Sequence, residues 1–193
     1  PNLDAFAKEN IVFENAHCTA PFTKMSLPAI MFGRFHYFSE PYPKKSLGHF
    51  FQEAGYQNWK CTQALEDVPG FDITTPSQSY NADRVNMMLL EFLDTKRDKS
   101  KPFFAWAHYF DPHASYELHP EIYNSGTSKI DRYDSEIAYT DHHIGKVFEY
   151  LKKQGLWDNT VIAFTADHGE EFMEHGFYFH GYNLYETLMH VPL

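Results

Sequence analysis

The chain has 193 residues and a mass of 22.6 kDa, the size of one domain or of part of a larger one. With 43% hydrophobic and 22% charged residues it has a globular composition, which excludes a disordered, collagen-like or coiled-coil chain. The 26 acidic residues outnumber the 16 basic ones, the net charge is −10 and no lysine or arginine cluster occurs, so we expect no nucleic-acid partner. No apolar run approaches the roughly 20 residues that a membrane span needs.

Histidines and cysteines bear on the chemistry of the chain. Nine of the 12 histidines follow residue 100, and this high density of histidine suggests a functional role for some of them. Cys18 and Cys61 lack the spacing of a zinc site and are compatible with one disulfide or none, so the redox compartment stays open.

The first half of the chain alternates short helices and strands. Glycines and capping residues mark the helix ends, and β-branched or aromatic runs mark the strands. We predict helices over residues 2–8 (capped by Asn2), 24–32 (capped by Thr23) and 46–54, strands over 11–13 and 56–61, and loops over 16–23 and 67–79.

The second half continues this alternation with longer elements. Its predicted elements are helices over residues 82–96 and 128–154 and buried strands over 103–107 and 161–164. On the long helix we expect six residues to face inward: Ile137, Thr140, Ile144, Val147, Phe148 and Leu151. Strands that alternate with helices of this length predict an α/β fold with a central, mostly parallel sheet. Its ligand site would lie beyond the carboxyl ends of the strands.

Asp167, His168 and Gly169 directly follow the last predicted strand. A carboxylate and an imidazole in succession can present two ligands to one divalent cation, and glycine lets the backbone turn beneath them. The alternative interpretation is a solvated turn with a capping aspartate. The residues Glu174, His175 and His180, further along the chain, favour the metal site because they could add groups to the same face.

Thr23 is placed at the predicted start of a helix, where the backbone N–H groups suit a phosphate or sulfate. A nearby metal would lower the pKa of its hydroxyl and make it a nucleophile. The competing interpretation is a plain helix cap.

A third group, His108, Asp111 and His113, follows the strand over residues 103–107. An imidazole here could hold a substrate oxygen or protonate a leaving group. We prefer His113, because Pro112 fixes it just past the strand, and consider a structural role equally plausible for His108.

Taken in order, the motifs of the chain resemble the sulfatases of the alkaline phosphatase superfamily. The resemblance covers nearly the whole chain, and its order and spacing are more specific than any single motif. The matching segments are 1–4, 11–16, 20–34, 104–113, 133–145, 159–161, 165–172, 174–176, 180–181, 185–186 and 191–193.

The resemblance implies an alkaline-phosphatase-like sandwich and a role for five residues. Asp167 and His168 match metal ligands, Thr23 matches the nucleophile and would also contact the metal, and His113 and His180 match histidines that bind the substrate anion or leaving group. It further implies one or two divalent ions (Ca, Mg, Mn or Zn) and a periplasmic, extracellular or membrane-anchored setting. Members of the family first form an ester on the nucleophile and then release it to water or to another acceptor.

The chain departs from the sulfatase pattern at the nucleophile. Formylglycine-forming sulfatases need Cys or Ser there, usually with Pro or Ala two residues on and Arg four residues on, whereas Thr23 is followed at those places by Met25 and Leu27. Threonine resembles instead the branch that transfers or hydrolyses phosphoryl groups. The Gly-Lys-Trp-His stretch of many sulfatases is also absent after Gly55-Tyr56.

From these residues and the resemblance we expect a metal-dependent hydrolase of sulfate or phosphate esters that uses Thr23 as nucleophile. Two alternatives remain: a phosphoethanolamine- or phosphoglycerol-type phosphotransferase, and a non-catalytic anion-binding relative. The substrate would be a small-molecule, glycan-linked or lipid-linked ester. We interpret residues 1–193 as a partial catalytic domain that lacks the family's first metal-ligand strand and its C-terminal part.

Overall fold

The computed structural model describes residues 1–35, 45–62, 68–75 and 81–193. Its centre is a parallel sheet of three strands in the order β2-β1-β3: β1 is Gln57–Cys61, β2 is Ile73–Thr75 and β3 is Phe103–Ala107. The predicted strands over 56–61 and 103–107 are confirmed. By contrast β2 lies inside the segment predicted as a loop, of which residues 67 and 76–79 fall outside the described part.

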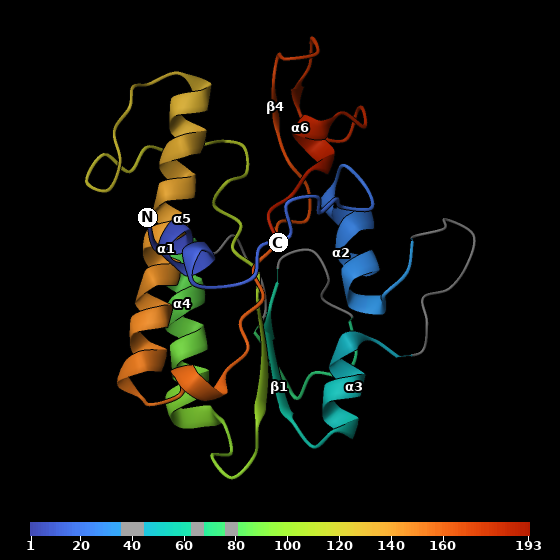
Figure 1. Cartoon of the computed structure of the whole chain (residues 1–193), viewed down its shortest axis with the longest axis vertical. Helices are drawn as coiled ribbons and strands as arrows, with labels where there is room; N and C mark the ends of the chain where they lie inside the picture. Colours follow the sequence, from blue (N-terminus) through green and yellow to red (C-terminus); the bar gives the residue numbers. More distant parts are fainter. Residues whose placement is uncertain (36–44, 63–67, 76–80) are drawn as a thin grey trace.

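Six α-helices surround this sheet in the part of the chain that the structure describes: α1 (Asn2–Lys8), α2 (Thr23–Phe32), α3 (Leu47–Glu53), α4 (Ala82–Glu91), α5 (Lys129–Lys153) and α6 (Glu186–Met189). A π-helical turn, Phe92–Lys96, continues α4, and a 3-10 turn, Trp157–Asn159, follows α5. Figure 1 shows α1, α4 and α5 on one side of the sheet and α2 and α3 on the other. The predicted α/β architecture, a parallel sheet flanked by helices, is therefore confirmed.

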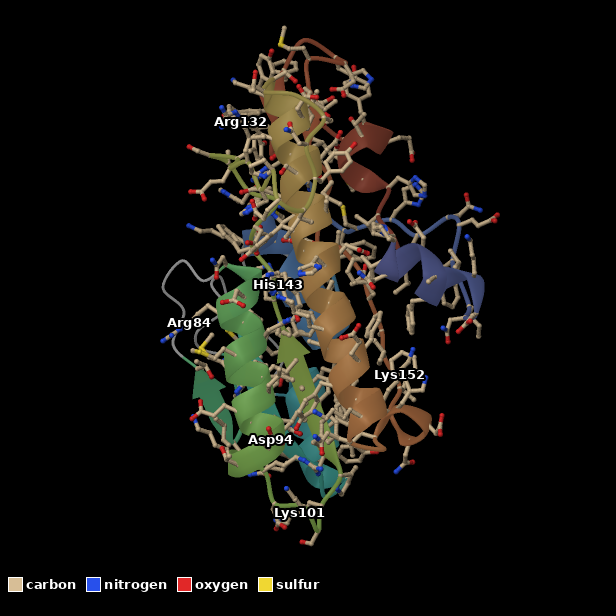
Figure 2. The ribbon with its side chains drawn as sticks, turned by 90° about the vertical axis from the view of Figure 1, so that its left-hand side faces the viewer. Arg84, Asp94, Lys101, Arg132, His143 and Lys152 are labelled. Carbon is tan, nitrogen blue, oxygen red and sulfur yellow. The ribbon has the colours of Figure 1, made fainter. Side chains whose placement is uncertain are left out.

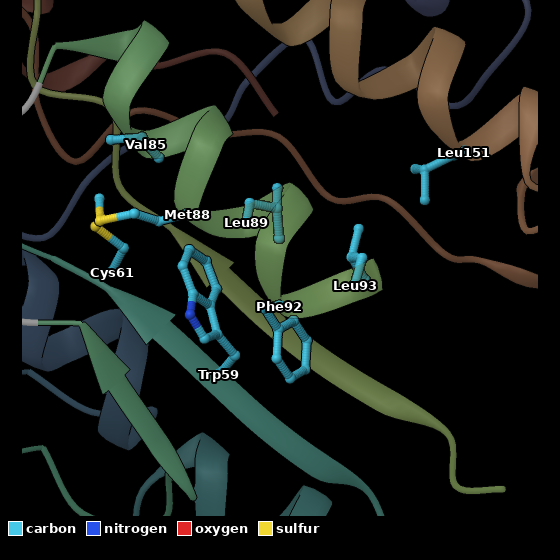
Figure 3. Close-up of a cluster of buried hydrophobic side chains, with 8 residues drawn as sticks. All are labelled: Trp59, Cys61, Val85, Met88, Leu89, Phe92, Leu93 and Leu151. Atoms are coloured by element: carbon cyan, nitrogen blue, oxygen red, sulfur yellow. The ribbon is translucent and has the colours of Figure 1, made fainter. Parts of the chain in front are cut away.

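The main hydrophobic core lies between the sheet and the helix pair α4 and α5. Trp59 of β1 stacks on Phe92 with ring centroids 5.9 Å apart, and both side chains are almost fully buried. Figure 3 shows the whole cluster: Trp59, Cys61, Val85, Met88, Leu89, Phe92, Leu93 and Leu151. The apolar side chains of α4, which recur with a helical spacing of 3.6 residues, thus face the sheet, as the sequence predicts.

Polar contacts join α4 to α5, which lie side by side in Figure 2. The amide of Asn86 donates to the carbonyl of His143 at 2.6 Å, and the hydroxyl of Tyr109 donates to Asn86 Oδ1 at 2.7 Å. Because Asn86 is buried, this chain of bonds satisfies polar atoms that would otherwise destabilise the fold. It also ties the loop after β3 to both helices.

Helix ends follow the predicted boundaries closely, but two capping assignments were wrong. Ser128 and Asp131 form a capping box at the start of α5. Thr23 is the first residue of α2 rather than its cap, since Phe22 holds the extended cap position and no side chain caps this end. Asn2 lies inside α1 and turns its side chain to Asp141 of α5, which accepts hydrogen bonds from Asn2 and from the Leu3 backbone.

Two predicted strands are not strands in the described structure. Residues 161–164 alternate between exposed and half-buried positions, and Val161 is 98% exposed, yet no described strand pairs with them. Residues 11–13 also lack a ladder, and all three are exposed. An extended apolar segment becomes a strand only when a neighbour accepts its backbone hydrogen bonds, which local sequence cannot reveal. On α5, Ile137 is 42% exposed and was wrongly predicted to face inward.

The last quarter of the chain forms a small antiparallel hairpin, β4 (Glu171–Phe172) and β5 (Tyr178–Phe179), followed by α6. In Figure 1 this hairpin and α6 lie at one end of the molecule, beyond the start of α2. No helix in the described residues combines the length and the apolar character that crossing a membrane requires. Both cysteines are free thiols.

Candidate active site

The carboxyl ends of β1 and β3 form the floor of the site. Their register pairs Cys61 with Ala107, so the next residue of each strand, Thr62 and His108, lies at the same edge. Nδ1 of His108 is 3.3 Å from the hydroxyl oxygen of Thr62. Burial lowers the pKa of His108, which keeps its imidazole neutral. His108 therefore lies at the edge of the site and contacts the residue that follows β1.

Thr23 and the Asp167-His168 pair meet beside this edge, although 145 positions separate Thr23 from His168 in sequence. The hydroxyl oxygen of Thr23 is 3.1 Å from Nε2 of His168. The same nitrogen is 3.6 Å from Oδ2 of Asp167, and the two side chains are 10% and 17% exposed. The structure thus brings together the three residues that the sequence proposed as nucleophile and metal ligands.

The hydrogen bonds of His168 fix which of its nitrogens faces Thr23. Nδ1 lies 2.7 Å from the carbonyl oxygen of Gly169, which can only accept, so Nδ1 carries the proton. Nε2 of the neutral ring is then left with its lone pair, and the Thr23 hydroxyl donates to it. This is the arrangement of a metal-binding histidine, whose other nitrogen donates to a carbonyl or carboxylate.

The donor set fits a divalent cation. Oδ2 of Asp167 is buried and has no hydrogen-bond partner in the described part of the chain, an uncommon state for a buried carboxylate oxygen. It lies beside the lone pair of His168 and the oxygen of Thr23, a mixed O and N set that suits several divalent metals. No group of three or more His, Cys, Asp or Glu residues suitable for a metal occurs among the described residues, so this set alone is incomplete as a coordination shell.

The requirement for glycine at position 169 comes from close packing of two backbone segments, and not from the turn that the sequence suggests. A Cβ at this position would collide with the backbone carbonyl of Thr187, the second residue of α6. The backbone N–H of Gly169 donates to the carbonyl of Leu188 at 2.8 Å. Glycine is required because two backbones touch here, and their contact sets the Asp167-His168 pair against α6.

His180 and His113 complete the cluster around His168. The ring centroid of His180 is 4.2 Å from that of His168 and 5.6 Å from that of His113. The His113 ring stacks on Phe110 with a centroid distance of 4.3 Å, and its Nδ1 lies 2.7 Å from the carbonyl oxygen of Ala114. Three imidazoles from three segments of the chain thus form one cluster, in which His168 contacts the Thr23 hydroxyl.

Other candidates lie outside this cluster. The carboxylate of Asp111 faces the backbone N–H of Ala82 at the start of α4, and burial raises its pKa. His175 binds Glu171 at 2.5 Å and stacks on Tyr185, while Glu174 accepts from the Phe172 backbone. Of the three downstream residues that could have added groups to the site, only His180 reaches it.

Sequence reasoning missed Glu170 and Tyr116. Glu170 binds Nδ1 of His180 at 2.9 Å with one carboxylate oxygen and accepts from the Tyr116 hydroxyl at 2.7 Å with the other. The position of Glu170 two residues after His168 was a usable signal, because its side chain had to lie near the strand end. Tyr116 offered none, since its role depends on a loop path that only the fold defines.

Comparison with known proteins relates the chain to sulfatases. Arylsulfatase K from Canis lupus familiaris is 33% identical over 91 residues, which is 40% of this chain and 17% of that protein. The structure of BT4656 in complex with D-glucosamine-2-N,6-O-disulfate has a TM-score of 0.80 and 18% identity, and the similarity covers the whole chain and 65% of that protein. The chain therefore spans less than two thirds of the length of these relatives.

Two further structures relate the fold to a wider group. The periplasmic domain of phosphoethanolamine transferase EptC from Campylobacter jejuni has a TM-score of 0.72 and 17% identity over 99% of the chain and 69% of that domain. An alkaline phosphatase superfamily protein from Vibrio parahaemolyticus has a TM-score of 0.74 and 22% identity over the whole chain and 52% of its own length. The fold is that of the alkaline phosphatase superfamily, and the Sulfatase family model matches residues 1–193. The chain belongs to the sulfatase family.

Proposed function

We propose that this protein is a metal-dependent hydrolase that cleaves sulfate or phosphate esters by transferring the sulfuryl or phosphoryl group to Thr23. One observation carries the proposal: the Thr23 hydroxyl oxygen lies 3.1 Å from Nε2 of His168, and this nitrogen lies beside a buried carboxylate oxygen of Asp167 that has no hydrogen-bond partner among the described residues. A plain helix residue would not need such neighbours. The position of Thr23 at the first residue of α2 supports the same role, because the free N–H groups of a helix start favour an anion.

The residues have distinct parts in the reaction. Asp167, His168 and Thr23 would hold the divalent ion, which lowers the pKa of the hydroxyl and offsets the negative charge of the ester. With the ion bound, the Thr23 hydroxyl would lose its proton to solvent, and Oγ1 would form a bond to the sulfur or phosphorus atom while the bond to the ester oxygen breaks. His113 and His180, whose ring centroids lie 5.6 Å apart, would bind the remaining anion oxygens, and His180, protonated at both ring nitrogens, would give a proton to the departing oxygen. Water then cleaves the ester on Thr23 and restores its hydroxyl.

A phosphotransferase is the second candidate, and the identity of residue 23 favours it. Threonine cannot become the formylglycine that many sulfatases use. The fold is also shared with a phosphoethanolamine transferase. In that case an acceptor alcohol, rather than water, would take the group from Thr23. The substrate in either case is a small-molecule, glycan-linked or lipid-linked ester.

The test is activity of the full-length protein on matched aryl sulfate and aryl phosphate esters. We expect turnover of at least one ester with a divalent ion present, and its loss in Thr23→Ala but not in Thr127→Ala, which changes an exposed threonine. Release of the free anion indicates a hydrolase, whereas adducts of an added alcohol indicate a transferase. Turnover that survives Thr23→Ala overturns the nucleophile, and binding without turnover indicates an anion-binding relative.

A further inference from the structure

Both oxygens of the buried Glu170 carboxylate have a partner, and one of these partners is His180 of the candidate active site. We propose that Glu170 is a positioning residue: it holds the imidazole of His180 so that Nε2 faces the reacting ester. The inference rests on the proposed ester-cleaving function, in which His180 contacts the leaving group. Glu170 itself touches neither Thr23 nor the metal-ligand pair in any contact that the structure shows.

The contacts define the orientation of His180. Oε1 of Glu170 lies 2.9 Å from Nδ1 of His180, and the Glu170 side chain is only 4% exposed. A carboxylate only accepts hydrogen bonds, so Nδ1 of His180 must carry the proton. Nε2 is then the nitrogen that faces the substrate, and it has no protein partner within the described residues. When the ring is protonated at both nitrogens, Nε2 can give its proton to the ester oxygen while Nδ1 stays bonded to Glu170. The ring that bears it packs against His168, 4.2 Å between centroids.

The position of the Glu170 carboxylate is determined by its contact with Tyr116. The hydroxyl of Tyr116 donates to Oε2 of Glu170 at 2.7 Å. The Tyr116 ring in turn packs against Tyr133 of α5 and Phe172 of β4, with centroid distances of 5.5 and 5.7 Å. Three separate segments therefore determine where the carboxylate points, as expected of a group that orients a functional side chain.

The residues on both sides of His180 have left-handed backbone conformations. Phe179 has a left-handed φ of 72°, and Gly181 has a φ of 92°. A left-handed backbone is unfavourable for phenylalanine and persists only when the surroundings impose it. The strained position is therefore Phe179, directly before His180, and the only hydrogen bond that the structure shows for the His180 side chain within the described residues is the one from Nδ1 to Glu170.

The other two imidazoles of the site do not depend on a side chain in this way. His113 and His168 each direct Nδ1 to the carbonyl oxygen of the next residue, so their orientation follows from the local backbone. His180 is oriented by a side chain that can be replaced. A variant at Glu170 should therefore affect His180 and leave His113 and His168 in place.

The kinetic test compares two esters of one class in the full-length protein, with phenol and with 4-nitrophenol as leaving groups. Because nitrophenolate departs without a proton, we expect Glu170→Ala to lower kcat about 10- to 100-fold on the phenyl ester and little on the nitrophenyl ester, with KM nearly unchanged. Glu170→Gln keeps an acceptor for Nδ1 and should restore most of the rate. Glu174→Ala, in the same hairpin, is the matched control.

A double-mutant cycle separates positioning from general damage. If Glu170 acts through His180, adding Glu170→Ala to His180→Ala causes no further loss. Equal losses on both esters, or additive losses in the double variant, overturn the inference. Loss of nitrophenyl ester turnover in Thr23→Ala is tested in parallel, so a failure of the proposed nucleophile is seen separately.

A spectroscopic measurement tests the geometry without any turnover. In protein labelled with ¹⁵N at histidine, we expect the neutral His180 ring to carry its proton on Nδ1, and Glu170→Ala to mix the two tautomers. The His113 and His168 signals should stay in place. A wild-type His180 with its proton on Nε2 overturns the inference, whatever the enzyme assays give.

Discussion

The carboxyl of Glu136 is buried between α5 and the loop that follows β3, and its ionisation should control the stability of the protein near neutral pH. Glu136 is 4% exposed. Its Oε1 accepts a hydrogen bond from the backbone N–H of Glu117 at 3.0 Å, and its Oε2 has no hydrogen-bond partner in the described structure. Burial, together with the negative charges of Asp111 and Glu117, raises the pKa of Glu136 from 4.5 to about 8.

The sign and size of the effect follow from this shift. Because the pKa of Glu136 is raised in the folded state, its neutral carboxyl contributes fully to the free energy of unfolding below about pH 4.5, where this carboxyl is neutral in both the folded and the unfolded chain. It is lost as the pH rises toward 8, because only the unfolded chain ionises in between. Each pH unit in this window costs about 1.4 kcal/mol, so the loss from pH 5.5 to 7.5 is about 2–3 kcal/mol. For a chain of this size that is about 4–12 °C in Tm.

Glu136→Gln tests this reasoning because the amide keeps the acceptor for Glu117 and cannot ionise. We expect the variant and the wild type to diverge in urea and thermal unfolding as the pH rises from 5.5 to 7.5, with the variant the more stable at pH 7.5. Glu149→Gln, an exposed change on the same helix, should leave the pH dependence unaltered. Parallel pH curves for Glu136→Gln and wild type would refute the assignment of a raised pKa.

Three further predictions concern the core and the site. Tyr109→Phe leaves the buried Asn86 oxygen without its donor and should lower the free energy of unfolding by about 1–3 kcal/mol in urea titrations; an unchanged midpoint contradicts the role of this bond. Thr23→Ser keeps a hydroxyl at the site and should retain measurable turnover, whereas equal inactivity of the Ser and Ala variants would argue against nucleophilic attack. Dialysis against a chelator should abolish activity and a divalent ion should restore it, with Asp167→Asn needing more metal; full activity in the chelated protein contradicts metal dependence.

Much of the fold could be predicted because its signals are local. The 3.6-residue pattern and the flanking caps and glycines located α4 and α5, and the apolar run over residues 103–107 located β3. The segment over 161–164 carried an equally clear strand pattern, yet no described strand pairs with it. The pairing of strands depends on residues far away in sequence, which a local pattern does not contain.

The site divides in a similar way. The sequence placed Thr23, Asp167 and His168 at the ends of a helix and a strand, where the general rule for α/β sheets puts ligands, and the structure brings all three together. His113 and His180 were proposed through the family resemblance, and both lie in the same cluster. Contacts that depend on the path of loops, such as those of Glu170, could not be predicted.

The central claim is that Thr23 accepts the sulfuryl or phosphoryl group from the ester. Rapid acid quenching of the full-length protein during turnover, followed by mass spectrometry of its peptides, tests this directly. We predict a sulfuryl or phosphoryl adduct on the peptide that contains Thr23, absent from Thr23→Ala. An adduct on His113 or His180, or steady turnover by the Thr23→Ala variant, would contradict the account.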